Sequence, residues 1–221
     1  YAGDEQKGVV IFIGEEPHIN VEQYSSSFLQ IVTDLNIERV VGFGGVYAEV
    51  PYDKERLVSG IFSLKRMKEE IAALAVNLSD YQGGASIGSY ICRRAGDLDM
   101  EYVSFYTFVP TYELSGSSQI GSSIRLENDY VAWLNVMRRV NYMLRLDIDL
   151  RDLEAKSERL KEVVSAKIEE LENTAPQLGV REYVDQVAEA FTELPFQPLD
   201  DVWEQEFRRL FEDGKGEADA A

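Results

Sequence analysis

The chain has 221 residues, of which 22 are basic and 40 are acidic, so its formal net charge is −18. This charge argues against a nucleic-acid-binding protein, because an acidic surface repels phosphates. Apolar residues make up 45% of the chain, enough for a globular core, but no apolar run approaches the ~20 residues of a membrane span.

The first half alternates strand-like and helix-like segments, which is typical of an α/β protein. Gly8–Gly14 is a continuous apolar run edged by glycines, so it predicts a strand buried on both faces. Apolar residues then recur every three or four positions from Asn20 to Leu35, which predicts a helix capped by Asn20 and stopped by Asn36. Arg39–Gly44 predicts a second buried strand, and the three segments together form a strand–helix–strand unit.

The next segments continue this alternation. Val58–Ser63 is a weaker strand candidate, and the apolar stripe from Leu64 to Leu78 predicts a helix. A turn is expected at Tyr81–Gly84, followed by a helix over Ser86–Ala95. Glu101–Val109 is rich in aromatic and β-branched residues and predicts a strand.

From residue 128 onward the helical period takes over. We predict a helix over Asn128–Arg145, an antiparallel helical hairpin broken around Pro176, and a short helix after Asp200. The apolar side chains of this part need a covering surface, so they are the predicted interface with another copy or with a client protein: Leu153, Leu160, Val164, Leu171, Trp203 and Phe207. The expected domains are an α/β domain over 1–146, the hairpin and short helix over 147–213, and a flexible acidic tail over 214–221.

A ligand pocket is predicted at the strand ends, because open α/β sheets bind ligands beyond the carboxyl ends of their strands. Adjacent carboxylates there suit acid and base catalysis or a divalent cation, although acidic pairs also simply face water. The two neighbouring glycines suit either a tight turn with positive φ or, less well, a phosphate cradle. The candidate pocket residues are Glu15, Glu16, Pro17, Gly44, Gly45, Tyr47, Glu49, Pro51 and Tyr112.

Two single residues bear on chemistry and compartment. His18 is the only histidine and Cys92 the only cysteine, which excludes an internal disulfide and any multi-cysteine or two-histidine metal site. His18 is either a general base or an ordinary loop residue, and Cys92 is interpreted as a buried packing residue. We predict no catalytic residue, no metal and no cofactor, and we expect a cytoplasmic protein with neither nucleic acid nor membrane as partner.

Four segments, in order and at matching spacing, resemble the proteasome assembly chaperone two family: Ile11–Pro17, Val40–Gly45 with Ala48–Pro51, Tyr81–Gly83 and Val109–Tyr112. The resemblance implies a three-layer α/β fold similar to nucleoside phosphorylases. Together with the segments above, this leads us to expect a mixed sheet flanked by helices, followed by the C-terminal helical hairpin. The resemblance also implies self-association, with a trimer favoured, and a role as a chaperone or scaffold for multi-subunit assembly.

The sequence departs from this family in three places. Members often carry a histidine and an arginine after the proline matched by Pro51, and a histidine after the proline matched by Pro110; both histidines are absent here. The chain ends Asp219-Ala220-Ala221, unlike archaeal members whose tails dock onto proteasome rings. The family usually has a strand-rich segment before the matched part, so we expect the chain to be N-terminally incomplete.

Two functions follow from these observations. The first is a non-enzymatic assembly chaperone or scaffold that self-associates and binds a protein client. The alternative is a small-ligand binding protein, or a hydrolase or phosphorylase-like enzyme, that binds a nucleoside-like molecule at the acidic strand ends.

Overall fold

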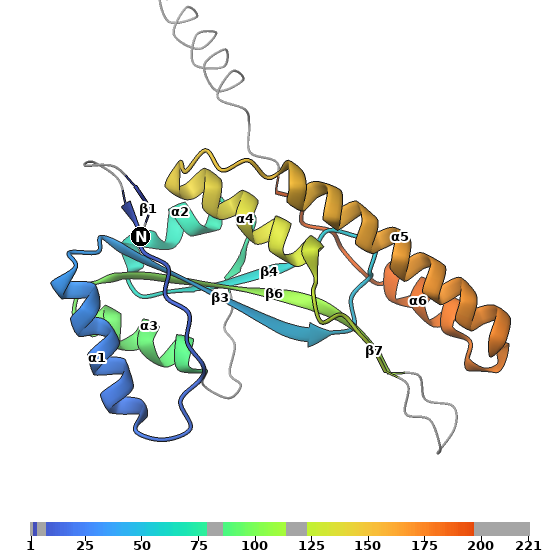
Figure 1. The fold of residues 1–221 in the computed structure, drawn as a ribbon, viewed down its shortest axis with the longest axis horizontal. Coiled ribbons are helices and arrows are strands. Elements are labelled where there is room, and N and C mark those ends of the chain that lie inside the picture. The colour runs from blue at the N-terminus through green and yellow to red at the C-terminus, as the bar shows by residue number, and fades with distance from the viewer. Residues whose placement is uncertain (1, 4–7, 79–85, 114–122, 197–221) are drawn as a thin grey trace, which may run out of the picture. The chain divides into compact units, whose positions relative to one another are not determined.

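The main sheet has five strands in the computed structural model, which describes residues 2–3, 8–78, 86–113 and 123–196 (Figure 1). Its order is β3 (Arg39–Ala48), β6 (Glu101–Glu113), β4 (Val58–Phe62) and β5 (Asn77–Leu78), and β7 (Ser123–Arg125) pairs antiparallel with the end of β6. A separate two-stranded ribbon joins β1 (Ala2–Gly3) to β2 (Gly8–Val9). The predicted α/β class is confirmed.

Strand directions show that the sheet is mixed. The backbone N–H of Ser63 donates to the carbonyl of Tyr102 at 2.9 Å, and that of Phe108 donates to the carbonyl of Leu57 at 3.1 Å. Residue numbers therefore rise along β6 as they fall along β4, so these strands are antiparallel. On the other side of β6, Gly42 lies against Ser104 and Gly44 against Tyr106, so β3 and β6 run parallel.

Most of the helices form where the periodicity of apolar residues in the sequence predicted them. They are α1 (Val21–Asp34), α2 (Lys68–Ala72), α3 (Ile87–Asp97), α4 (Tyr130–Leu144), α5 (Arg151–Thr174) and α6 (Val180–Glu189), with single 3-10 turns at Lys65–Met67 and Pro176–Leu178. The last two α-helices form the predicted hairpin (Figure 1). None of the helices in the described residues is both long and apolar enough to cross a membrane.

The chain divides into two compact units, each built from separate stretches. The first unit comprises residues 1–44, 60–71 and 78–106, and the second comprises residues 45–59, 72–77 and 107–221. The core of the first unit contains Leu29, Ile91, Cys92, Ala95 and Tyr102. The core of the second unit contains Tyr112, Val164, Ile168, Val180 and Val184.

The predicted strand at Gly8–Gly14 is wrong for most of its length. Only Gly8–Val9 is a strand, and Val10, Ile11, Phe12 and Ile13 are 45%, 75%, 57% and 91% exposed. A continuous apolar run indicates burial on two faces, but burial also requires a neighbouring strand. No described strand pairs with residues 10–14, so the run stays irregular.

The predicted helix over Leu64–Leu78 is also wrong beyond Ala72. Leu74 and Val76 are buried as expected, but the backbone turns at Ala75, whose φ is 51°. Within the second unit, the Arg139 side chain donates to the carbonyls of Leu74 at 2.9 Å and Ala75 at 3.1 Å. These carbonyls therefore bind a guanidinium, which substitutes for the helical amides that would otherwise satisfy them.

Helix caps follow the sequence in part. Asn36 stops α1 as predicted, in the left-handed region at a φ of 51°. Asn20 precedes α1 at a φ of 54°, but its side chain makes no capping bond, so that prediction is wrong. The Ser86 hydroxyl accepts the Ser89 N–H at the start of α3, and the Asp129 carboxylate accepts the N–H groups of Val131 and Ala132 at the start of α4.

Candidate functional site

The predicted pocket residues of the first unit lie after β2 and on β3. Glu15 is exposed, and the Oε1 atom of Glu16 accepts the N–H of Ile87 at 2.9 Å, at the start of α3. Pro17 is partly buried in the same segment. The Glu16 carboxylate is therefore bound to a helix N-terminus, where its negative charge is stabilised.

The two glycines of the predicted turn lie inside β3, which continues to Ala48. Neither has a positive φ, so the expected tight turn is wrong. A Cβ atom on Gly44 would lie 2.6 Å from the Cδ1 atom of Tyr106, so this position requires glycine because of close packing. A phosphate cradle needs backbone amides arranged in a turn, and this extended strand does not supply one.

The predicted pocket residues of the second unit are largely engaged in packing. Tyr112 is 1% exposed, and its hydroxyl donates to the carbonyl of Val50 at 2.8 Å. Its ring packs edge-on against Tyr183 of α6 at a centroid distance of 6.1 Å, and the Tyr183 hydroxyl donates to the Glu49 carboxylate. Burial raises the pKa of Tyr112 well above its ordinary value, so this phenol stays protonated. Pro51 is buried as well.

Gly45, Tyr47 and Glu49 are the exposed members of this group. The Tyr47 ring lies 5.7 Å from the guanidinium carbon of Arg125 on β7, a cation–π contact. The second-unit half of the predicted pocket is thus mostly a packing site for α6, with one exposed aromatic beside an arginine.

The most deeply buried ion pair among the described residues lies in the second unit, and sequence reasoning did not predict it. Arg56 is 1% exposed and Asp129 is 2% exposed, and the Nε atom of Arg56 donates to the Asp129 carboxylate at 2.8 Å. The Arg56 guanidinium also donates to the carbonyls of Pro51 and Lys54 at 3.0 and 2.7 Å. An aspartate immediately before an apolar helix indicates a cap, but nothing in the sequence pairs it with an arginine 73 residues away.

The predicted interface residues of α5 face the core of their own unit. Val164 is 5% exposed, and Leu160 and Leu171 pack against the cluster that contains it. Leu153 is partly buried. Trp203 and Phe207 lie outside the described residues. Leu160, Val164 and Leu171 are therefore covered by α6 and Tyr112 of the same chain.

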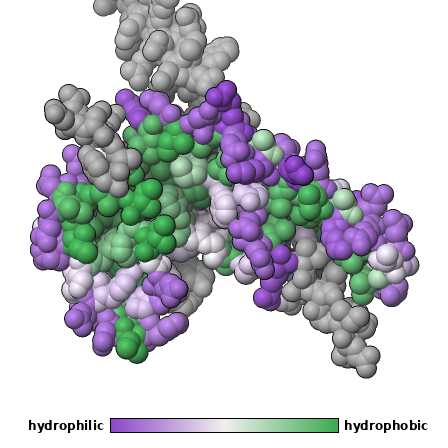
Figure 2. Space-filling view, viewed as in Figure 1, coloured by the Kyte–Doolittle hydropathy of each residue, from purple (hydrophilic) through white to green (hydrophobic). Residues whose placement is uncertain are grey.

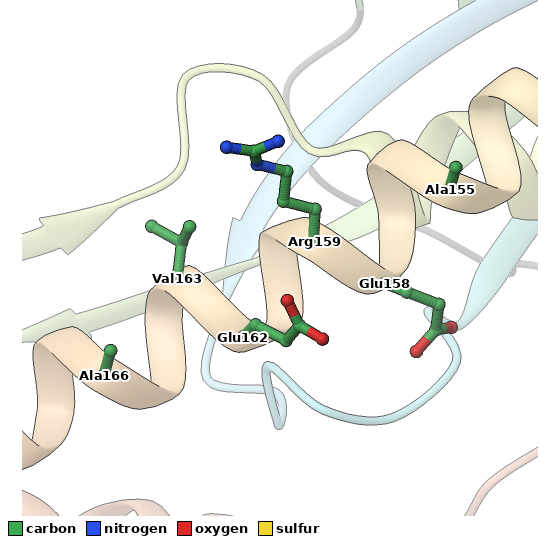
Figure 3. Close-up of a pocket in the computed structure, with 6 residues that line it drawn as sticks. All are labelled: Ala155, Glu158, Arg159, Glu162, Val163 and Ala166. Atoms are coloured by element: carbon green, nitrogen blue, oxygen red, sulfur yellow. The ribbon is translucent and has the colours of Figure 1, made fainter.

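The outer face of α5 carries an open depression of about 440 Å³ (Figure 3). Its lining residues all come from this single helix: Ala155, Glu158, Arg159, Glu162, Val163 and Ala166. Figure 3 shows Arg159 and Val163 pointing to one side of the helix and Glu158 to the other. A ligand there would stay exposed to water, so the depression lacks the enclosure typical of a small-molecule site.

The two residues considered for chemistry have no catalytic setting in the described structure. Burial raises the pKa of the Cys92 thiol to about 11, so almost no reactive thiolate exists at neutral pH. His18 is exposed in the segment between β2 and α1. Cys92 is thus a packing residue of the first core, as predicted.

A large apolar surface remains open on α1 of the first unit. Leu29 and Val32 are buried, but Ile31 and Leu35 on the adjoining face are 52% and 53% exposed. The ring of Phe12 packs edge-on against Phe28 at 5.3 Å and extends this face. We call the exposed Phe12, Ile31 and Leu35, together with Tyr24 and Phe28, which are partly buried against the first core, the α1 surface. Figure 2 shows hydrophobic residues gathered in the left half of the view, the side on which Figure 1 draws α1.

Comparison with known proteins identifies the family. The model of the PAC2 family matches residues 1–168. The chain belongs to the PAC2 family. This confirms the resemblance to the proteasome assembly chaperone two proteins. No curated protein matches the chain.

Solved structures of PAC2 proteins share the fold at low identity. A PAC2 family protein from Streptomyces avermitilis is 19% identical at a TM-score of 0.59, with 77% of this chain and 63% of that chain covered. The Mycobacterium tuberculosis proteasome-assembly chaperone homologue Rv2125 is 21% identical at 0.58, with 76% and 63% covered. Pyrococcus furiosus PbaA, an archaeal homolog of proteasome-assembly chaperone, is 18% identical at 0.50, with 78% and 65% covered. The chain thus spans less than two thirds of the length of each.

Proposed function

We propose that this PAC2 protein is a non-enzymatic assembly chaperone or scaffold that self-associates and binds the subunits of a larger complex. The observation that carries this proposal is the α1 surface, since exposed apolar patches of this kind mark protein-binding sites. The names of two similar structures, which are homologues of proteasome-assembly chaperones, support the same class of function.

The proposed contact is apolar and centred on Ile31 and Leu35. These side chains stand four residues apart on one helix face, the spacing by which a partner helix is commonly bound. The aromatic pair of Phe12 and Phe28 flanks them. Large rigid side chains of this type are the usual anchors of protein interfaces.

The test measures mass and client binding for matched variants of α1. Sedimentation of the wild-type protein at micromolar concentration is expected to give a multiple of the 25.1 kDa chain, with three copies favoured by the family resemblance. Ile31→Glu and Leu35→Glu should weaken self-association or capture of the co-purifying subunit about tenfold or more, since a charge is buried in an apolar contact.

Ser26→Glu is the matched control, because it adds the same charge to an exposed position on another face of α1. It should leave mass and client binding unchanged. A wild-type protein that stays a monomer and binds no subunit would refute the proposal, and an equal loss in the control variant would show that α1 is the wrong surface.

A further inference from the structure

α4 has a second apolar stripe on the side opposite its buried face. Tyr130, Trp133 and Met137 stand three and four residues apart, so they fall on one side of the helix. Trp133 is 47% exposed, and the other two side chains are partly exposed. A helix of a globular protein usually has one apolar stripe, which faces the core. A second, open stripe with a large aromatic side chain therefore indicates a contact surface.

Basic and apolar side chains of α5 border this stripe. The Lys156 ammonium lies 6.0 Å from the centroid of the Tyr130 ring, which packs edge-on against Trp133 at 5.1 Å. Arg159 and Val163 point to one side of α5 and line its open depression (Figure 3). Val163 is 58% exposed, and Arg159 forms no ion pair within the described part of the chain. We call the following residues the α4–α5 surface: Tyr130, Trp133, Met137, Lys156, Arg159 and Val163.

The charge of this surface differs from that of the chain as a whole. α4 contains two arginines and no acidic residue, although the net charge of the chain is −18. Lys156 and Arg159 add two positive charges beside the aromatic side chains. Glu162 also lines the depression on α5, so the surface presents both signs. A mainly acidic segment with aromatic side chains and some arginine is complementary to it.

The chain itself contains a segment with this chemistry, outside the described residues. Residues 200–213 include six acidic residues and two arginines. Trp203, Phe207 and Leu210 recur with the period of one helix face. Anchors with this spacing are typical of a helix that binds an apolar groove or stripe.

The described chain ends at α4, which favours this segment as the occupant. Phe196 is 6% exposed, and its ring lies 5.0 Å from the guanidinium carbon of Arg139 and 5.7 Å from the Tyr142 ring. Seven residues lead from Phe196 to Trp203, and they span up to about 23 Å, roughly twice the diameter of a helix. A short connection of this kind gives the segment a high effective concentration at α4. A separate molecule has no such advantage.

We propose that the α4–α5 surface is a docking site for an acidic, aromatic helix, and that its occupant is the segment 200–213 of the same chain. Trp203 and Phe207 cover the apolar stripe of α4, and acidic side chains face Lys156 and Arg159. Docking within one chain removes Trp203 and Phe207 from the predicted interface with another protein. It also closes the α4–α5 surface to other proteins. The inference is independent of the proposed contact at Ile31 and Leu35.

Tryptophan fluorescence of the full chain tests the docking. The chain has two tryptophans, so Trp203→Phe keeps an aromatic ring at this position and leaves Trp133 as the only emitter. In this background Phe207→Glu should raise the acrylamide quenching constant of Trp133 about twofold or more, because a charge opposes burial and the segment leaves the surface. Ala218→Glu adds the same charge outside the segment and should leave the quenching constant unchanged. An unchanged constant in Phe207→Glu would overturn the proposal.

Disulfide trapping identifies the occupant. In a Cys92→Ala background, Met137→Cys is combined in turn with Trp203→Cys or Phe207→Cys, so that two registers are sampled. Facing residues of packed helices can reach the Cα separation of about 4–7 Å that a disulfide requires. Under mild oxidation, at least one pair should form a bond within the monomer. Phe207→Cys with Glu169→Cys, an exposed position near the end of α5, is the control and should remain reduced. A bond between two copies, or no bond in either register, would overturn the proposal.

Discussion

The two units use the same chemistry, an arginine bound to carboxylates, in two different environments. In the second unit the Arg56–Asp129 pair is almost completely buried. In the first unit Arg39 binds Glu70 and Glu101 at 2.6 Å each, and its side chain is 20% exposed. Buried pairs are costly to break, whereas exposed pairs contribute little, because water solvates the separated charges. We therefore expect the stability of the second unit to depend on the Arg56–Asp129 pair far more than the stability of the first unit depends on the pairs of Arg39.

The largest expected effect is the loss of Asp129. Asp129→Ala should lower the free energy of unfolding by about 3–5 kcal/mol, because it leaves the buried Arg56 without a counter-charge. Asp129→Asn keeps a side chain that can cap α4 but removes the charge. It should therefore be less destabilising than Asp129→Ala by only the contribution of the cap, about 1 kcal/mol. Urea denaturation measures both.

The matched control is Asp152→Ala. This residue forms an exposed pair with Lys156 at 2.7 Å, and its side chain is 82% exposed. The substitution should cost less than about 1 kcal/mol. Equal losses for Asp129→Ala and Asp152→Ala would contradict the distinction between buried and exposed pairs.

A second large effect is expected for the seam of the helical hairpin. Ile168 is 1% exposed and lies in the cluster with Tyr112 and Val180. Ile168→Ala should cost about 2–5 kcal/mol, since it removes buried methyl groups and leaves a cavity. Val163→Ala, on the same helix at 58% exposure, should change stability by no more than about 0.5 kcal/mol. Similar losses at the two positions would mean that α5 is not packed by this face.

The seam also shows which parts of the fold a sequence can predict. The period of Leu160, Val164 and Leu171 identified both the helix and its apolar face, because burial of one helix face repeats every three or four residues. The same pattern could not identify what covers that face. Tyr112 and α6, which are distant from α5 or separated from it by a turn, cover that face. We expected an external partner for the seam because the periodicity of α5 alone does not reveal this contact.

Local pattern failed where a distant group decided the structure. The apolar stripe over Leu64–Leu78 correctly predicted that Leu74 is buried. It wrongly predicted a helix beyond Ala72, because Arg139 binds the carbonyls of Leu74 and Ala75 there. Gly44 was recognised as special, but the cause is contact with Tyr106 and not backbone conformation. The candidate pocket residues were chosen because α/β sheets bind ligands at their strand ends. Two of them, Tyr112 and Pro51, are instead buried by packing against other side chains, and the spacing of residues in the sequence does not reveal such packing.

Replacing Ser157 should stabilise the second unit. Ser157 interrupts the apolar seam of α5, is 1% exposed, and its hydroxyl has no hydrogen-bond partner among the described residues. A buried hydroxyl without a partner costs free energy, and alanine favours helix, so Ser157→Ala should raise the free energy of unfolding by about 1 kcal/mol. Urea denaturation measures this increase. Ser26→Ala on α1, at an exposed position, should give only the small gain of helix propensity.

The smallest expected effect concerns the ion pairs of the first unit and their dependence on pH. Hydrogen bonding to Arg39 holds the pKa of Glu101 below its ordinary value of 4.5. The folded state therefore favours the charged carboxylate, so this contribution is complete above that pH and is lost as the pH falls below it. In wild-type protein, the loss of stability from about pH 7 to about pH 3 should exceed that of Glu101→Gln by less than about 1 kcal/mol.

Salt separates this contribution from other acid effects. Added salt should reduce the difference between wild-type and Glu101→Gln at neutral pH, because ions screen partly exposed charges. The large cost of Asp129→Ala should persist under the same conditions, since its pair is shielded from ions by the surrounding protein. If salt reduced both effects equally, the two arginine pairs would share one environment, and the contrast between the units would fail.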